Sequence, residues 1–68
     1  MKINTVTFEN VDGAYEVTRT EGNTVEFLST EGNFRYSFAE GYTVYRSPIL
    51  SKAIGFALVA LAKEDAGQ

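Results

Sequence analysis

The chain has 68 residues, of which 44% are hydrophobic, and it contains no cysteine, no histidine and no tryptophan. This length allows one small domain over residues 1–68, which buries only about 60% of the surface of its unfolded chain and is therefore marginally stable alone. Without cysteine or histidine there is no disulfide, no zinc–thiolate site, no thiol nucleophile and no usual general base. We therefore expect a non-enzymatic protein with no metal and no cofactor, reinforced by association with another chain.

The charge of the chain makes nucleic acid an unfavourable partner. Six basic and nine acidic residues give a net charge of −3, whereas nucleic-acid binders present a basic surface to the phosphates. No apolar run follows Lys2, so no secretory signal is predicted. The lack of cysteine fits a cytoplasmic protein.

Residues 1–46 are predicted to form an antiparallel β-meander. Glycine-containing turns recur at intervals of about ten residues, and the segments between them are rich in Thr, Val, Tyr and Phe. The turns lie at 10–13, 20–23, 30–33 and 39–41, and the strands are predicted at 2–8, 14–20, 24–30, 34–39 and 42–46. The short connection at 39–41 leaves open that the last two strands are one bent strand.

Alternation along these strands separates an apolar face from a polar face. The apolar face is predicted to carry Val6, Phe8, Tyr15, Val17, Val25, Phe27, Phe34, Tyr36, Phe38, Tyr42 and Val44. The polar face is predicted to carry Thr5, Thr7, Glu16, Thr18, Thr20, Thr24, Glu26, Leu28, Arg35, Ser37, Thr43 and Tyr45. A sheet with one solvated side needs a cover on its other side.

The segment 47–64 is predicted to be the covering helix, followed by a frayed tail at 65–68. Ser47 is a suitable N-cap and Pro48 suits the first helical position. On a helical projection the inward stripe consists of Leu50, Ile54, Ala57, Leu58 and Leu61, widened on one side by Ile49, Ala53, Phe56 and Ala60. The predicted fold is thus α+β, a meander of four to five strands covered on one face by a single C-terminal helix.

This helix has more apolar surface than one sheet can cover. Its apolar arc spans about 200°, against the roughly 100° that packing on a sheet requires. We expect the surplus to meet a second copy in a homodimer or higher oligomer, through Ile49, Ala53, Phe56, Val59 and Ala60. Two other interpretations stay open. A curved sheet can enclose the whole arc, or the helix can lie on a membrane surface, although its apolar stretch at 53–62 is too short to cross a bilayer.

Two classes of function remain. The first is a small interaction or regulatory protein that acts as a homo-oligomer and binds another protein, because exposed apolar patches mark contact sites. The alternative is a single-stranded nucleic-acid-binding module, in which aromatic rings stack on bases and cations follow the backbone. The residues available for that role are Arg19, Arg35, Tyr45 and Arg46.

Overall fold

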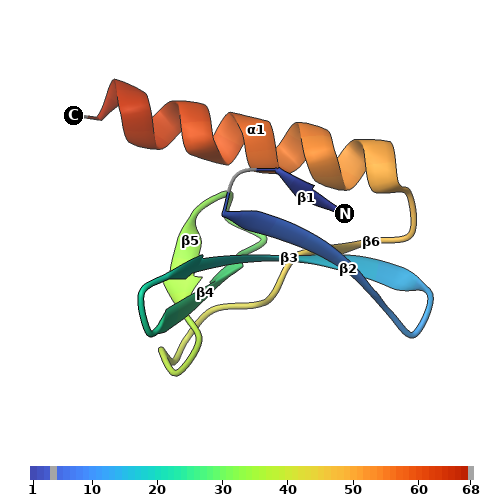
Figure 1. Cartoon of the computed structure of the whole chain (residues 1–68), viewed down its shortest axis with the longest axis horizontal. Helices are drawn as coiled ribbons and strands as arrows, with labels where there is room; N and C mark the ends of the chain where they lie inside the picture. The colour runs from blue at the N-terminus through green and yellow to red at the C-terminus, as the bar shows by residue number, and fades with distance from the viewer. Residues whose placement is uncertain (4, 68) are drawn as a thin grey trace.

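The computed structural model describes residues 1–3 and 5–67, and in this part of the chain one helix lies along one face of an antiparallel sheet (Figure 1). The elements are β1 (Lys2–Ile3), β2 (Val6–Val11), β3 (Ala14–Glu21), β4 (Thr24–Leu28), β5 (Phe34–Tyr36), β6 (Arg46–Ser47) and α1 (Leu50–Ala66). The predicted α+β fold, a meander covered by a single C-terminal helix, is confirmed. Asn4, within the first predicted strand, and Gln68, within the predicted tail, lie outside the described residues.

Strands β1 to β5 form a meander in which each strand pairs with the next. Tight turns connect the long strands. Asp12 and Gly13 both have positive φ, at 52° and 87°, as a type I′ turn between β2 and β3 requires. Gly22 has a φ of 59° in the turn between β3 and β4, which leaves Glu21 opposite Thr24. These two turns set the register of the central strands.

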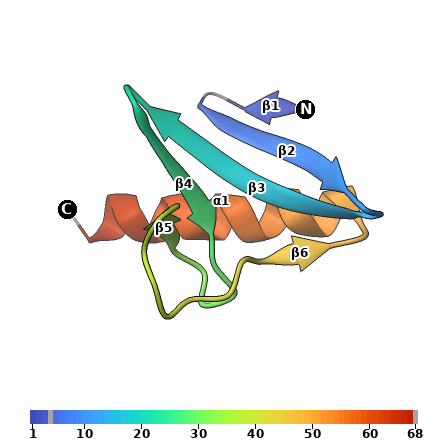
Figure 2. The same cartoon turned by 90° about the horizontal axis from the view of Figure 1, so that it is seen from below.

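The ends of the predicted meander need correction. The predicted strand at 2–8 is two strands, because β1 folds back on β2 and pairs Lys2 with Thr7. The strands predicted at 34–39 and 42–46 are replaced by the shorter strands β5 and β6, which a loop connects. Strand β4 pairs only with the second half of β3. Strand β6 pairs with Tyr15 and Glu16 in the first half of β3, on the same edge of that strand (Figure 2).

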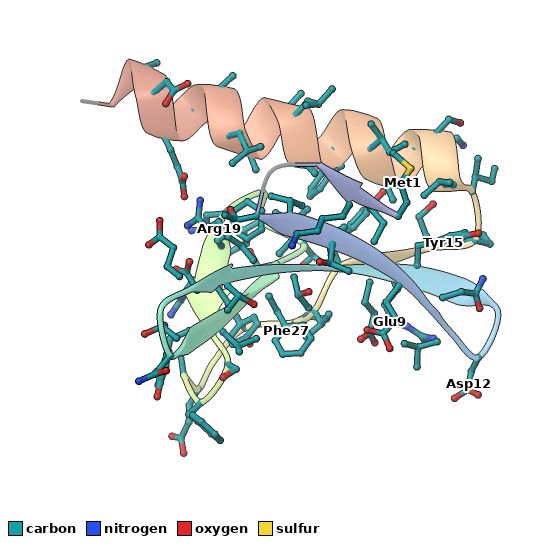
Figure 3. The ribbon with its side chains drawn as sticks, in the orientation of Figure 1. Met1, Glu9, Asp12, Tyr15, Arg19 and Phe27 are labelled. Carbon is teal, nitrogen blue, oxygen red and sulfur yellow. The ribbon has the colours of Figure 1, made fainter. Side chains whose placement is uncertain are left out.

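Strand β4 presents the opposite faces from those predicted. Residues that pair across neighbouring strands share a face, and the register places Glu26 opposite Arg19 on the helix side. Leu28 is therefore buried in the core, whereas Val25 and Phe27 are directed to the other side of the sheet, as the labelled Phe27 shows in Figure 3. The register set by the turn overrides the apolar pattern of the strand.

The segment after β5 also departs from the predicted alternation. Tyr36 and Phe38, both predicted to face the core, are 49% and 81% exposed. Tyr45, predicted to face solvent, packs against the core and stacks on the ring of Phe56 with centroids 4.1 Å apart. The Ala39 N–H donates to the Tyr36 carbonyl at 2.8 Å. The chain therefore turns at this point, and the two-residue period of a strand ends.

The core lies between the sheet and α1. It consists of Val6, Phe8, Val17, Leu28 and Phe34 from the strands and Ala53, Ala57 and Ala60 from the helix. The larger helix residues Leu50, Ile54, Phe56 and Leu61 pack around this centre. Leu58, predicted to lie in the inward stripe, is instead 50% exposed. The helix turns its alanines toward the sheet because Phe8 and Phe34 already fill the layer beneath it.

The first helical residue is Leu50 rather than Pro48, and the helix ends at Ala66, two residues later than predicted. Ile49 is the N-cap residue, and its side chain makes no capping hydrogen bond. Ser47 belongs to β6, and its hydroxyl accepts the Ile49 N–H at 3.2 Å instead of capping the helix. Lys63 lies in the last turn, where it complements the helix dipole as predicted.

Candidate functional site

Two exposed apolar surfaces are the candidate sites of this molecule. One is the outward face of α1, and the other lies at the end of β5. The described part of the chain encloses no pocket and holds no cluster of three acidic side chains suited to a metal ion. In the described part of the chain, no helix is long and apolar enough to span a bilayer.

Arg19, a predicted nucleic-acid contact, is the centre of an ion-pair network between sheet and helix. Its Nε donates to Glu26 Oε1 at 2.9 Å, and its Nη1 and Nη2 donate to the two carboxylate oxygens of Glu64 at 2.5 and 3.0 Å. Its guanidinium carbon lies 4.2 Å from the centroid of the Phe34 ring, in a cation–π contact. Figure 3 shows Arg19 under the C-terminal half of α1. The residue thus ties β3, β4 and α1 together.

The surroundings of Arg19 favour its charged form. The hydrogen bond to Glu64 raises the pKa of the guanidinium above its ordinary value, burial opposes this rise, and Glu26 adds to it. The side chain is only 13% exposed. Its donors are therefore directed to protein carboxylates.

The other predicted nucleic-acid contacts lie in separate places. Arg46 pairs with Glu16 at 3.3 Å on the edge of the sheet. Tyr45 is packed beneath α1. Arg35 lies on the face away from the helix, with its guanidinium carbon 5.5 Å from the centroid of the Tyr42 ring. The structure does not bring the four predicted residues into one continuous basic surface.

The predicted oligomer residues divide between core and surface. Ala53 and Ala60 are buried against the sheet and Phe56 is half-buried, so the expected set needs correction. The two alanines face inward because they allow the helix to approach the sheet closely. Ile49 and Val59 are exposed and stay candidates for contact with a second copy.

The outward face of α1 is a strip formed by Gly55, Leu58, Val59 and Ala62. Leu58 and Val59 are 50% and 55% exposed, and Gly55 and Ala62 are exposed on the same side of the helix. The strip contains no charged residue. A projection weighted by side-chain size places Leu58 inward and does not indicate this strip, whereas a projection centred on the alanines does.

The second surface is the aromatic corner, formed by Tyr36 and Phe38. Their rings meet edge to face, with centroids 5.5 Å apart and an interplanar angle of 64°. The apolar alternation of β5 continues through Phe38 and therefore predicts that both rings face the core. Only the turn after Tyr36, which the pattern does not indicate, exposes them.

Charge is distributed unevenly between the two layers of the molecule. Residues 1–46 carry four basic and seven acidic side chains, whereas residues 47–68 carry two of each. The whole net charge of −3 therefore belongs to the sheet and its loops, and the helix layer is neutral.

Comparisons with known proteins give no match: no family model, no curated protein and no solved structure matches this chain.

Proposed function

We propose that this chain is a small non-enzymatic interaction protein that forms a homodimer through the outward face of α1 and binds other proteins. The exposure of Leu58 and Val59 on an uncharged strip supports this proposal. Complete burial of an aliphatic side chain contributes about 1.5–3 kcal/mol relative to exposure, so a partner that covers half-exposed side chains gains about half of that for each. Exposed apolar strips of this kind mark contact sites.

The distribution of charge favours a second copy as the occupant of this strip. Contact between two helices joins the neutral layers and keeps the two acidic sheets on the outside of the dimer. Contact between two sheets brings the acidic side chains of both copies together, which is unfavourable.

The flanks of the strip indicate a parallel arrangement of the two helices. On a helical projection Lys63 lies on one side of the strip and Asp65 on the other. A two-fold axis parallel to the helices places Lys63 of one copy near Asp65 of the next. Antiparallel helices instead bring the lysine sides of both copies together, and Lys52 lies on that same side.

The dimer is expected to be weak and reversible. A helix of 17 residues is about 25 Å long, and half of its lateral surface amounts to about 400 Å² for each subunit. A standard interface buries about 800 Å² for each partner. We therefore expect a dissociation constant on the order of micromolar.

Analytical ultracentrifugation of Leu58→Asp tests the dimer. The wild-type chain should sediment as a dimer at about ten times its dissociation constant, and Leu58→Asp should sediment as a monomer with an unchanged circular dichroism spectrum. Thr20→Asp, which adds the same charge at an exposed position of the sheet, is the matched control and should remain dimeric. A wild-type chain that is monomeric at about 1 mM contradicts the proposal.

Cross-linking of single-cysteine variants tests the orientation, because the native chain contains no cysteine. In the parallel dimer Ser51→Cys should oxidise to a disulfide-linked dimer, since the two copies of residue 51 lie at the same height. In an antiparallel dimer these positions are about 20 Å apart and do not react. An equimolar mixture of Ser51→Cys and Ala66→Cys that forms only the mixed disulfide contradicts the parallel arrangement.

Single-stranded nucleic-acid binding, the second function indicated by the sequence, is not favoured by any specific observation. Arg19 and Arg46 both pair with glutamates. The net charge of −3 opposes the approach of phosphates.

A further inference from the structure

We infer that the aromatic corner is a second docking surface, and that its occupant is a positively charged polypeptide segment that carries an apolar side chain. Tyr36 and Phe38 belong to β5 and the turn after it, whereas the proposed dimer uses α1. The two surfaces thus use different residues, and the inference does not depend on the dimer.

The corner is held in place by its backbone. The Ser37 N–H donates to the Val25 carbonyl at 2.9 Å, and the Ala39 N–H donates to the Tyr36 carbonyl at 2.8 Å. The edge-to-face contact between the two rings fixes them further. Rings ordered before binding lose little conformational entropy when a partner covers them. Phe38 is 81% exposed, so its apolar area is available to a partner.

Carboxylates lie close to the two rings in the register of the sheet and along the chain. Glu26, the cross-strand partner of Tyr36, is already paired with Arg19, and the register places Glu21 on the same face of the sheet. Glu40 follows Phe38 by two residues. Glu21 and Glu40 are exposed, and no salt bridge within the described part of the chain involves either of them. Aromatic faces among carboxylates attract a guanidinium or an ammonium group through cation–π and ionic contacts.

The same carboxylates discriminate against other occupants. A second copy brings its own Glu21 and Glu40 to the contact, and like charges in an interface are repulsive. Nucleic acid and anionic lipid also carry negative charge toward the corner. A cationic polypeptide is the partner whose charge and apolar character both match.

Selection from a phage-displayed library of random dodecapeptides on the biotinylated full chain tests the inference. The enriched peptides should be cationic, with Arg or Lys next to an apolar residue, and should bind the Tyr36→Ala/Phe38→Ala variant about tenfold more weakly or worse. Both side chains are exposed, so this variant should keep the wild-type circular dichroism spectrum. Leu58→Asp should bind the same peptides normally, which separates this surface from the proposed dimer.

Matched variants distinguish a specific site from general attraction to an acidic protein. Val25→Ala, on the other face of the sheet, should change peptide affinity by less than about twofold. Glu21→Gln/Glu40→Gln should weaken binding and reduce its salt dependence more than Glu9→Gln/Asp12→Asn, two residues far from β5 in Figure 3. Enrichment of neutral or acidic peptides, equal binding to the double-alanine variant, equal effects of the two charge variants, or no enrichment each overturns the inference.

Discussion

Arg19 holds the C-terminal half of α1 on the sheet, and its replacement measures that contribution. Arg19→Met keeps an unbranched side chain over Phe34 but removes the guanidinium from Glu26 and Glu64. Because the Glu64 side chain is 39% exposed, the expected loss lies between those of surface and buried pairs, at about 1–2 kcal/mol of unfolding free energy. Urea denaturation at neutral pH measures it.

Arg46→Met is the matched control for this change. Arg46 pairs with Glu16, and their side chains are 42% and 23% exposed, so the expected loss is below about 1 kcal/mol. Equal losses in both variants contradict the role assigned to Arg19. The raised pKa of Arg19 adds stability that is present below the ordinary pKa of arginine and is lost only as pH rises through its higher folded value. The effect of Arg19→Met should therefore be constant between about pH 6 and 9.

The N-terminus of α1 is the place where a single substitution should increase the stability of the fold. Ile49 occupies the N-cap without a side-chain hydrogen bond, and the first turn contains no acidic residue. Ile49→Asp supplies an acceptor for the N–H groups of the first turn and a charge that suits the helix dipole. We expect it to be about 0.5–2 kcal/mol more stable than Ile49→Ala, which loses the same apolar contacts without gaining a cap.

Chemical denaturation at a concentration where the chain is monomeric measures this difference, so that any role of Ile49 in the dimer does not contribute. Equal stability of the two variants would show that residue 49 does not act as the cap.

The central strands and the helix were predictable from the sequence, but the faces of β4 were not predicted correctly. The alternation of Val25 and Phe27 indicates an inward apolar row, whereas the tight turn at Gly22 fixes the register and places Glu26 inward. An inward Glu26 is tolerated because Arg19 neutralises it. Arg19 in turn reaches Glu64, which lies 45 residues further along the chain, and local alternation contains no information about such a pair.

The rotation of α1 illustrates the same limit. A projection weighted by side-chain size selects the leucines as the inward stripe, and Leu58 among them. The helix instead turns Ala53, Ala57 and Ala60 to the sheet, because the depth available above the phenylalanine rings decides which face fits. That depth is a property of two elements together. It is therefore not visible in the helix sequence alone.

At the scale of the whole molecule, the acidic half and the neutral half can be read directly from the sequence, since each corresponds to a continuous segment. The aromatic corner cannot, because its exposure depends on where the chain leaves β5 and turns. The uncharged strip on α1 and the acidic corner at β5 belong to different elements. The proposed dimer and the proposed docking surface therefore use different residues, one set uncharged and the other acidic.

The proposed dimer forms from folded chains, so it predicts that the thermal stability of this chain depends on its concentration. A partner that binds only the folded state raises the unfolding free energy. Each tenfold rise in concentration above the dissociation constant then adds about 0.7 kcal/mol for each subunit of a dimer. In a domain of this size, that corresponds to an increase in Tm of about 3–6 °C.

Differential scanning calorimetry over a hundredfold range of concentration measures this shift. Leu58→Asp should unfold at one Tm throughout the range, because its folded state has no partner, and Thr20→Asp should shift as the wild-type chain does. If the wild-type Tm is independent of concentration, the folded chain does not dimerise. A shift that persists in Leu58→Asp means that the copies meet through a surface other than the outward face of α1. If the wild-type shift agrees with the dissociation constant measured by analytical ultracentrifugation, the contact through Leu58 and Val59 contributes to the stability of the whole molecule.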